Sequence, residues 1–382
     1  MPGESIPALL VSHTVALQPG GGGVQRCSRE YCDALRAAGF DLRMEIFSLD
    51  GSLSARVRRR ITPAPHRHFL PAGLARRCLQ AADTAGTNLI FLNHSETGPL
   101  AAELHALSPQ PLHIVMLSHG LDSTDFLHEA DISGASDRRP RRTASALGRL
   151  LFTEMRERPE FAAVFCLSEV DLQIEHWLGT RRACLLPRIV EDRPLPWRPV
   201  PGRMGTVSTL DHPPNWDGLV RFCEALAAAG AADVRLRVVG GPAERGRALA
   251  AAHAGVEYLG PFDDAQLAAE AATWAVFVNP IFRYARGCST KLAQPLSWRL
   301  PAATTRAGAR GYRWDETVVP LANDAAELAR LALPLARSPG PASRAAVERI
   351  AAASPRLADI ALLIRSTLAP FGIPGPTTPG LR

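Results

Sequence analysis

Short apolar runs alternate with helix-like stretches along this chain, and the alternation restarts in its second half. Runs typical of buried strands lie in the first half at residues 8–13, 42–47, 89–93, 113–118 and 163–168. Those of the second half lie at residues 205–210, 234–240, 256–259, 275–280, 302–305 and 318–321. Because strands that alternate with helices form parallel βαβ units, the pattern predicts an α/β fold with two parallel sheets.

A proline-rich break at residues 187–201 separates the two alternating halves. Proline lacks a backbone N–H and fixes one dihedral angle, so such a stretch is typical of a linker. The pattern therefore predicts two Rossmann-like domains that face each other across a cleft. The expected segments are an N-terminal domain at 1–192, a linker at 193–202, a C-terminal domain at 203–342, a helix at 343–370 that packs back on the N-terminal domain, and a disordered tail at 371–382.

Basic residues exceed acidic ones, which gives a net charge of +6. Arginines cluster at residues 56–60, 76–77 and 138–142, all in the first half. Aromatic residues make up only 6% and do not interleave with these clusters, which argues against binding of single-stranded nucleic acid. Two interpretations remain open, namely a solvated arginine-rich surface and peripheral contact with an anionic membrane.

Mean hydropathy is −0.01, and no apolar run approaches the roughly 20 residues that a spanning helix needs. The apolar start of the chain, residues 6–13, is expected to be a first strand rather than a signal peptide. The seven cysteines form no CxxC pair, so neither a disulfide framework nor a zinc site is indicated. We expect a cytoplasmic protein without a bound metal or cofactor.

Lys291 is the only lysine among the 43 basic Lys and Arg residues. It lies between the apolar run at 275–280 and a helix-like run at 292–300. An ammonium group at a helix N-terminus is a good partner for phosphate, because backbone N–H groups attract the same anion. The alternative is a surface lysine without a function.

The glycine run at residues 20–23 follows the first strand and precedes a helical stretch. It does not match the dinucleotide-binding pattern, because Gln25 stands where the third glycine is required. No P-loop lysine is present, and Cys288 replaces the serine that an SxxK motif needs before Lys291. The run is therefore either a loop over which a substrate binds closely or a plain turn.

Titratable side chains follow several of the predicted strands. His13 ends the first strand, and Glu96 comes soon after the strand at 89–93. His119 and Asp122 follow the strand at 113–118. Because ligands of parallel sheets bind beyond the carboxyl ends of the strands, these residues are candidates for a catalytic base or for substrate binding. A surface position without a function is the alternative for each.

Four sequence stretches together resemble GT-B glycosyltransferases, above all the nucleotide-sugar enzymes of glycosyltransferase family 4. Gly-Gly-Val-Gln-Arg at residues 22–26 is similar to the acceptor-side loop and first helix of that family. The stretches at 205–218 and 238–262 resemble the first strands of the donor domain. The stretch at 280–305 is similar to the donor-site segment, in which a glycine loop, a lysine, a helix and a strand follow in order.

The resemblance implies a role for particular residues. Lys291 and the loop before it would bind the donor diphosphate, Phe262 would line the base pocket, and His119 would face the donor sugar. The residues implied in donor binding are Phe262, Arg283, Arg286, Gly287, Ser289, Thr290, Lys291 and Gln294. Those implied in the acceptor-side loop are His13, Gly21, Gly22 and Gly23.

The chain departs from the family at two positions of the donor-site segment. Family 4 enzymes usually carry two glutamates eight positions apart, and the matching residues here are Arg286 and Gln294. Gln294 can still hydrogen-bond a ribose hydroxyl, whereas Arg286 reverses the charge. The substitutions leave the donor and the stereochemistry of the reaction open.

The resemblance implies a glycosyltransferase that moves a sugar from a nucleoside-diphosphate sugar to a glycan, lipid-linked or small-molecule acceptor. We expect a metal-independent, retaining hexosyltransferase of polysaccharide or glycoconjugate synthesis. An inverting reaction would need a base, for which Asp122, Glu96 and His119 are the candidates. The alternatives are a catalytically inactive sugar-nucleotide-binding or scaffold subunit, and a GT-B sugar-nucleotide epimerase.

Overall fold

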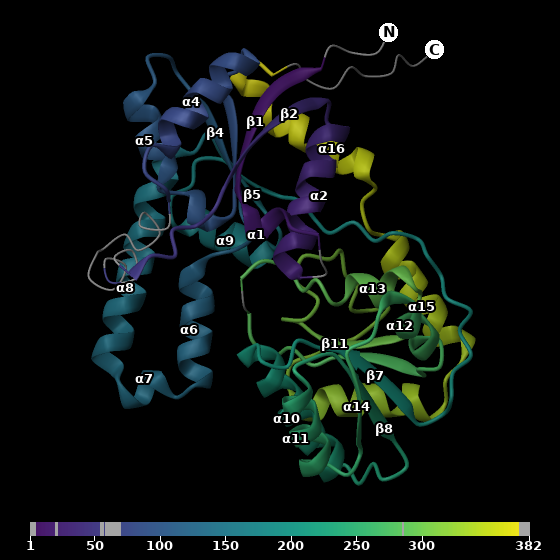
Figure 1. The fold of residues 1–382 in the computed structure, drawn as a ribbon. Coiled ribbons are helices and arrows are strands. Elements are labelled where there is room, and N and C mark those ends of the chain that lie inside the picture. Colours follow the sequence, from purple (N-terminus) through teal and green to yellow (C-terminus); the bar gives the residue numbers. More distant parts are fainter. Residues whose placement is uncertain (1–4, 20–21, 54–56, 58–69, 285, 374–382) are drawn as a thin grey trace, which may run out of the picture. The chain divides into compact units, whose positions relative to one another are not determined.

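A computed structural model describes residues 5–19, 22–53, 57, 70–284 and 286–373 of the chain (Figure 1). The chain divides into two compact units. The first unit consists of residues 1–126, 139–187 and 355–382, and the second unit of residues 127–138 and 188–354. Two predicted features, Gly21 and most of the tail at 371–382, lie outside the described residues, as do the arginines at 56 and 58–60.

The first unit is built on a parallel six-stranded sheet in the order β2-β1-β3-β4-β5-β6. Apart from β2 and β6, these strands are buried on both faces, which explains why they read as continuous apolar runs. The strands are β1 (Ile6–His13), β2 (Phe40–Phe47), β3 (Leu89–Asn93), β4 (His113–Leu117), β5 (Ala163–Cys166) and β6 (Ala183–Leu185).

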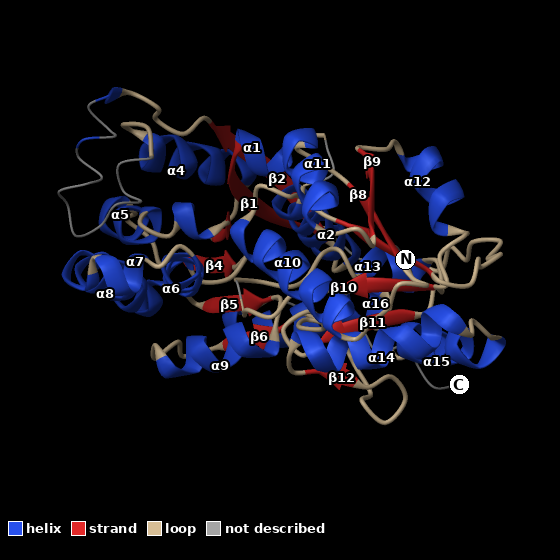
Figure 2. Cartoon of the chain, turned by 90° about the horizontal axis from the view of Figure 1, so that it is seen from below, coloured by secondary structure: helices blue, strands red, loops and turns tan. Residues whose placement is uncertain are grey.

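Helices flank the strands of this sheet (Figure 2). The C-terminal helix α16 (Leu357–Leu368) belongs to the first unit, where it packs against α2 (Gly23–Ala37), and Arg365 Nη1 donates to the Ala38 carbonyl at 3.3 Å. The other helices of residues 1–187 are α1 (Thr14–Leu17), α4 (Leu74–Ala85), η2 (Ser95–Thr97), α5 (Leu100–Leu107), α6 (Asp122–Ile132), α7 (Ala135–Arg138), α8 (Pro140–Glu157), η3 (Arg158–Glu160) and α9 (Glu169–Trp177), and η4 (Ala369–Phe371) follows α16.

The second unit contains another parallel six-stranded sheet, in the order β12-β11-β10-β7-β8-β9. Its strands are β7 (Arg203–Val207), β8 (Arg235–Val239), β9 (Val256–Gly260), β10 (Val276–Asn279), β11 (Ala302–Thr305) and β12 (Leu321–Ala322). Its helices are α10 (Pro213–Ala228), α11 (Ala243–Ala252), α12 (Asp264–Ala271), α13 (Ala293–Ser297), α14 (Ala325–Arg337) and α15 (Pro341–Ala352).

Each sheet carries its own hydrophobic core. In the second unit, Trp274 is fully buried, and the strand β7 passes so closely beneath it that a Cβ at Gly205 would lie 1.8 Å from Trp274 Cδ2. Trp197, from the proline-rich stretch, donates from Nε1 to the Trp274 carbonyl at 2.7 Å. Part of the stretch that reads as a linker is therefore packed against the second unit.

The α/β fold with two parallel sheets is confirmed, and the observed strands coincide closely with the predicted apolar runs. Two predictions were wrong. The run at 318–321 contributes little strand, since β12 contains only Leu321 and Ala322. The helix expected at 292–300 is only the short α13, because Arg299 adopts a left-handed conformation (φ 55°) and Leu300 N–H donates to the Pro295 carbonyl, which ends the helix.

Within the described part of the chain, no helix is long and apolar enough to span a membrane. The seven cysteines are all free thiols in the structure. The irregular helices α6, α7 and α8 between β4 and β5 were not predicted from the sequence.

Candidate functional site

The first unit gathers polar side chains at the carboxyl ends of three adjacent strands. His13 is the last residue of β1, Asn93 ends β3 and is followed by His94, and His119 comes two residues after β4. All four side chains are buried. Because β1, β3 and β4 are parallel neighbours, their ends meet at one edge of the sheet. The structure thus brings together His13, Glu96 and His119, as predicted.

His13 faces the carboxylate of Glu96. Its Nε2 lies 3.4 Å from Glu96 Oε2, and its Nδ1 accepts a hydrogen bond from Ala16 N–H at 3.3 Å and caps α1. Burial lowers the pKa of His13, so the ring is neutral at pH 7. Since Nδ1 is the acceptor, the ring proton is assigned to Nε2, which lies near Glu96 but makes no hydrogen bond within the described residues.

His94 completes this group from the other side. Its Nδ1 lies 3.6 Å from Glu96 Oε2, and its ring stands edge-on to His13 with centroids 5.3 Å apart. The backbone of His94 has φ 84°, which is unusual for a residue with a side chain. Such strain persists where the surroundings enforce it and is frequent in binding sites.

His119 belongs to a second network that adjoins the first. Its Nε2 lies 2.9 Å from Asn93 Oδ1, while Asn93 Nδ2 donates to Ser12 Oγ at 2.9 Å and Ser28 Oγ at 3.0 Å. Because the amide nitrogen of Asn93 is the donor, His119 Nε2 is assigned as the donor to its oxygen. The ring of His119 is therefore held in one orientation, 5.1 Å from the ring of His94.

His13, His94 and Glu96 present ligand atoms within 4.8 Å of one another, close enough to surround a metal ion. A histidine that binds a metal normally carries its proton on the other ring nitrogen and donates it. In His13 that other nitrogen accepts from Ala16 N–H. The acceptor role of His13 Nδ1 therefore argues against metal coordination through Nε2, and the unpartnered Nε2 beside Glu96 suits the binding of a substrate hydroxyl.

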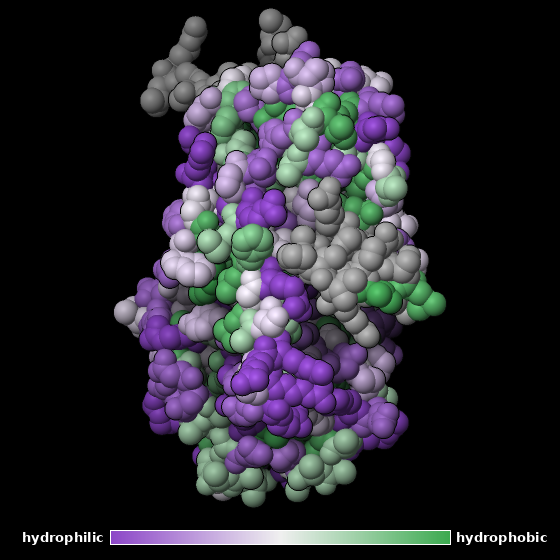
Figure 3. All heavy atoms as spheres, turned by 90° about the vertical axis from the view of Figure 1, so that its left-hand side faces the viewer, coloured by the Kyte–Doolittle hydropathy of each residue, from purple (hydrophilic) through white to green (hydrophobic). Residues whose placement is uncertain are grey.

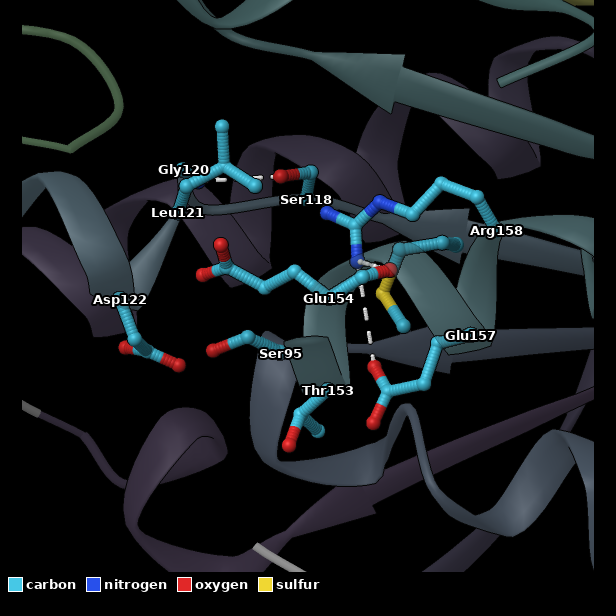
Figure 4. Close-up of a pocket in the computed structure, with 10 residues that line it drawn as sticks. Ser95, Ser118, Gly120, Leu121, Asp122, Thr153, Glu154, Glu157 and Arg158 are labelled. Atoms are coloured by element: carbon cyan, nitrogen blue, oxygen red, sulfur yellow. Dashed lines mark hydrogen bonds and ion pairs between the residues drawn. The ribbon is translucent and has the colours of Figure 1, made fainter. Parts of the chain in front are cut away.

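Asp122, the third predicted catalytic candidate, begins α6 and lines a separate small cavity (Figure 4). Glu154 shares this cavity and accepts hydrogen bonds from Ser123 N–H at 3.0 Å and Ser123 Oγ at 2.5 Å. Burial raises the pKa of Glu154. The cavity measures about 20 Å³, room for one water molecule but not for a sugar, so Asp122 does not line a substrate-sized pocket here.

The second unit places Lys291 in a turn between β10 and α13. Its side chain is partly buried, and Nζ donates to Ser208 Oγ at 3.2 Å, just beyond the end of β7. Burial lowers the pKa of Lys291 to about 7, and the positive charge of Arg310 adds to this. Among the described residues, no carboxylate lies within ion-pair distance of Lys291. The predicted anion site thus rests on this ammonium and not on α13, which is too short to contribute a substantial dipole.

The loop before Lys291 is fixed by hydrogen bonds. Gly287 has φ 65°, a conformation that glycine adopts readily. Ser289 is buried, its hydroxyl accepts from Asn279 Nδ2 at 3.3 Å, and its carbonyl accepts from Tyr312 OH at 2.7 Å. Ser289 therefore shapes the loop, and Thr290 is the partly buried residue that leads to Lys291.

Arg310 is a site residue that the sequence analysis did not identify. It is buried, and it donates from Nε to the Gly287 carbonyl at 2.9 Å and from Nη1 to the Ala307 carbonyl at 2.6 Å. The signal that could have found it is its place in Gly-Ala-Arg-Gly at residues 308–311, soon after the end of β11. The carboxyl ends of β7, β10 and β11 thus contribute Ser208, the Lys291 loop and Arg310 to one region.

The remaining predicted donor-site residues lie around this loop with less definite roles. Arg286 and Gln294 are partly buried, and Gln294 lies in the first turn of α13. Arg283 forms an ion pair with Asp131. Phe262 is half-buried against the core of the second unit, so its predicted contact with a nucleotide base stays a prediction.

Gly22 and Gly23 form the start of α2, with Gly22 as its N-cap. A Cβ at Gly22 would lie 2.1 Å from Gln25 Oε1, the end of a flexible side chain that can move away. Gln25 Nε2 donates to the Val15 carbonyl at 3.0 Å and thereby ties α2 to α1. The described part of the loop is thus shaped by contacts within the first unit, and its role in closing over a substrate stays a prediction.

Comparisons with known proteins agree with this architecture. Residues 201–337 match the family model described as "Glycosyl transferases group 1". No curated protein sequence matches the chain. Three similar solved structures are sucrose-phosphate synthase from Thermosynechococcus elongatus (17% identity, TM-score 0.63, covering 96% of this chain and 99% of that one), trehalose 6-phosphate synthase from Burkholderia multivorans (13%, 0.61, 96% and 99%), and WaaG, a glycosyltransferase involved in lipopolysaccharide biosynthesis (13%, 0.56, 97% and 100%). At these identities the likeness establishes the fold.

Proposed function

Because this chain has the GT-B fold and its residues 201–337 match the group 1 glycosyl transferases, we propose that it transfers a sugar from a nucleoside-diphosphate sugar to an acceptor. The proposal combines a donor site in the second unit with a hydroxyl-binding site in the first. The nucleotide sugar is a substrate, and the proposal requires no further cofactor.

The observation that carries the proposal is the environment of Lys291. A partly buried ammonium group that lacks a carboxylate partner is a favourable place for an anion to bind, because the anion balances its charge. The hydrogen bond to Ser208 Oγ supplies a neutral acceptor, and no described carboxylate pairs with the group. A diphosphate would supply the missing negative charge.

In the proposed reaction, the bond between the anomeric carbon and the diphosphate oxygen breaks, and the leaving diphosphate gains negative charge. Lys291 stabilises that charge directly, and Arg310 adds a second positive charge nearby. Preorganised charges of this kind act without rearrangement as the bond breaks, which makes them effective in catalysis. This role requires no metal ion.

The first unit would bind the acceptor hydroxyl and the donor sugar through His119, His13 and Glu96. We propose a retaining transfer, for which no dedicated base is needed. For an inverting transfer, Glu96 is the best placed of the three candidates, because its side chain is 20% exposed while His119 is buried and Asp122 lines the small closed cavity. Analysis of the anomeric configuration of the product by NMR distinguishes the two outcomes.

The acceptor that we propose is a glycan or a lipid-linked sugar in polysaccharide or glycoconjugate synthesis, with the protein cytoplasmic and peripheral on an anionic membrane. Support for the membrane contact comes from α8, which exposes Arg141 and Arg142 near one end and Phe152 and Met155 near the other. The face of the molecule on which α8 lies is mostly hydrophilic with smaller hydrophobic areas (Figure 3). Cosedimentation with anionic and with neutral vesicles tests this part separately.

The main experiment is a panel of nucleoside-diphosphate sugars, screened for thermal stabilisation and for release of the nucleoside diphosphate. We expect one donor class to stabilise the protein and to be hydrolysed slowly. Lys291→Ala is expected to lose this response, whereas Arg330→Ala, on the exposed face of α14, keeps it. If no member of the panel binds, the proposed function is wrong.

A catalytically inactive sugar-nucleotide-binding subunit is the second candidate, favoured by Arg286 and Gln294 at the positions of the usual glutamates. Tight binding of a donor without turnover against any acceptor would support it. A sugar-nucleotide epimerase is less well supported, because it needs carboxylates in the donor site and Arg286 stands at one of those positions.

A further inference from the structure

Ser208 lies directly after β7 and is held there by its backbone. Its N–H donates to the Val239 carbonyl at 2.9 Å, which continues the pairing of β7 with β8. Its carbonyl oxygen lies against Gly240, where a Cβ would come within 1.9 Å of it. Gly240 has φ 135°, a conformation that glycine adopts readily. Ser208 is therefore fixed in place, and it is only 5% exposed.

The hydroxyl of Ser208 has a hydrogen-bonding capacity that the protein does not use. Its oxygen accepts from Lys291 Nζ at 3.2 Å. A hydroxyl can also donate one hydrogen bond, but within the described parts of the chain no acceptor takes the Ser208 hydrogen. By contrast, the hydroxyl of Thr305 at the end of β11 donates to the Ile281 carbonyl and accepts from Gly308 N–H at 2.9 Å. The Ser208 hydrogen is thus available to a ligand.

The hydrogen bond from Lys291 makes the Ser208 hydroxyl a stronger donor, because a hydroxyl that accepts from a cation is polarised. The ammonium group has three N–H donors, and among the described residues only Ser208 accepts from it. The two side chains therefore present one O–H and two N–H donors side by side. A phosphate group carries several oxygens on one centre and a negative charge, which fits such a set of donors.

We propose that Ser208 is a phosphate-binding residue, whose hydroxyl donates to the same phosphate group that Lys291 binds. That this phosphate belongs to a nucleoside diphosphate rests on the proposed function. The donation itself rests on the burial of Ser208, on its unused hydrogen and on its hydrogen bond to Lys291. Ser208 thus contacts the ligand and also orients the ammonium group.

The first test is Ser208→Ala, measured by calorimetry with pyrophosphate and with UDP. Because a hydrogen bond to a charged oxygen is lost, we expect affinity for both ligands to fall about 10–100-fold. Ser208→Thr keeps the hydroxyl and should recover most of the affinity. The matched control is Ser343→Ala, which removes a hydroxyl that bonds the Gly340 carbonyl at the start of α15 and should leave binding unchanged. Thermal unfolding shows whether each variant is folded, and Ser208→Cys, with its weak donor, replaces an unfolded Ser208→Ala.

A double-mutant cycle separates contact with the ligand from orientation of Lys291. If Ser208 only orients Lys291, Ser208→Ala has no further effect once Lys291 is replaced by methionine. If the hydroxyl donates to phosphate, Ser208→Ala also weakens pyrophosphate binding in the Lys291→Met background, by roughly 3–10-fold. The factor is smaller in this background because no cation polarises the hydroxyl. Phosphorus NMR titrations measure the weak affinities that we expect for these variants.

The outcomes separate this inference from the proposed function. Unchanged affinity of Ser208→Ala for both ligands would overturn the inference while leaving the proposed function intact. An effect that disappears in the Lys291→Met background would overturn it too, because Ser208 would then only orient Lys291. Pyrophosphate binding that Ser208→Ala weakens in both backgrounds, without binding of any nucleotide, would support the inference and count against the proposed function. If the natural protein binds neither ligand, both are wrong.

Discussion

Arg158 in the first unit is buried and Lys291 in the second is partly buried, and the two cations have opposite kinds of partner. In the first unit, Arg158 donates to both oxygens of Glu175 at 2.9 and 2.6 Å, and Thr180 Oγ1 donates to the same carboxylate at 2.6 Å. Burial alone would lower the pKa of Arg158, but Glu175 more than offsets this and the net shift is upward. In the second unit, Lys291 bonds a neutral hydroxyl, and its pKa is shifted downward.

The difference between Arg158 and Lys291 separates a charge that stabilises the fold from a charge that is available to bind a ligand. A buried ion pair with well-directed hydrogen bonds has its charges balanced within the protein. A buried cation without such a partner has a free energy that an incoming anion can lower. The first arrangement is expected to matter for stability and the second for binding.

The largest expected effect is on the balanced pair. Glu175→Ala removes the counter-ion of a buried arginine and should lower the free energy of unfolding by about 3–5 kcal/mol. Denaturant unfolding measures this. Asp233→Asn, which breaks the exposed pair with Arg337, is the control and should leave the denaturation midpoint nearly unchanged. Similar losses in the two variants would mean that burial does not distinguish these pairs.

The next effect concerns the unbalanced cation. Lys291→Met keeps a side chain of similar length without charge, so we expect UDP affinity to fall by roughly 10–100-fold. Stability should not fall and should increase near neutral pH, because a desolvated charge is removed. Calorimetry and thermal unfolding of the same samples test both parts. If Lys291→Met loses stability as well as UDP affinity, Lys291 stabilises the fold in the way that Arg158 does, and the predicted contrast is wrong.

A third prediction concerns how the contribution of Lys291 to stability depends on pH. The pKa of Lys291 is about 7 in the folded protein and 10.5 when unperturbed, so the folded state binds fewer protons than the unfolded state between these values. Stability from this group therefore rises with pH from about 7 upward, by at most about 1.4 kcal/mol per unit. Below pH 7 the penalty is constant. The stability advantage of Lys291→Met should shrink as pH rises from 7 to 9, as measured by denaturant unfolding.

The smallest effect is expected at Glu96. In a retaining transfer its carboxylate only binds and orients, so Glu96→Gln should slow turnover of the donor less than tenfold. Loss of a general base would cost roughly 100-fold or more. Steady-state turnover rates with the donor identified in the panel distinguish a binding role of Glu96 from a role as general base. A hundredfold loss in Glu96→Gln would contradict the retaining mechanism and support an inverting one with Glu96 as base.

The fold was largely predictable, because parallel strands that are buried on both faces leave continuous apolar runs in the sequence. The strands β3 and β11 begin and end at the predicted residues. The early end of α13 was not predictable from spacing, since it depends on the left-handed conformation of Arg299. The helices α6 to α8 were not predicted, because few of their residues are buried and, in α6, the apolar pattern is weak.

The candidate site was predictable in its residue types but not in its pairings. His13, Glu96 and His119 were selected as separate candidates by their positions after strand ends, and the structure places them at one edge of the sheet because the strands are parallel. Their roles stay predictions. Arg310 was missed because its position in a glycine-containing loop after a strand does not stand out in a chain so rich in arginine, and its contact with the Gly287 carbonyl is visible only in the structure. Asp122 stays a prediction, because sequence position does not reveal that it lines a small cavity separate from the histidines.

The placement of α16 in the first unit has a consequence for biosynthesis. Residues 188–354 of the second unit are synthesised before residues 355–373, which the first unit needs to cover α2. On the ribosome, the second unit therefore has its whole chain available while the first still lacks a helix. Synthesis of the first unit thus begins before that of the second unit and ends after it. Until α16 is made, the nascent first unit exposes the face of α2 that α16 later covers.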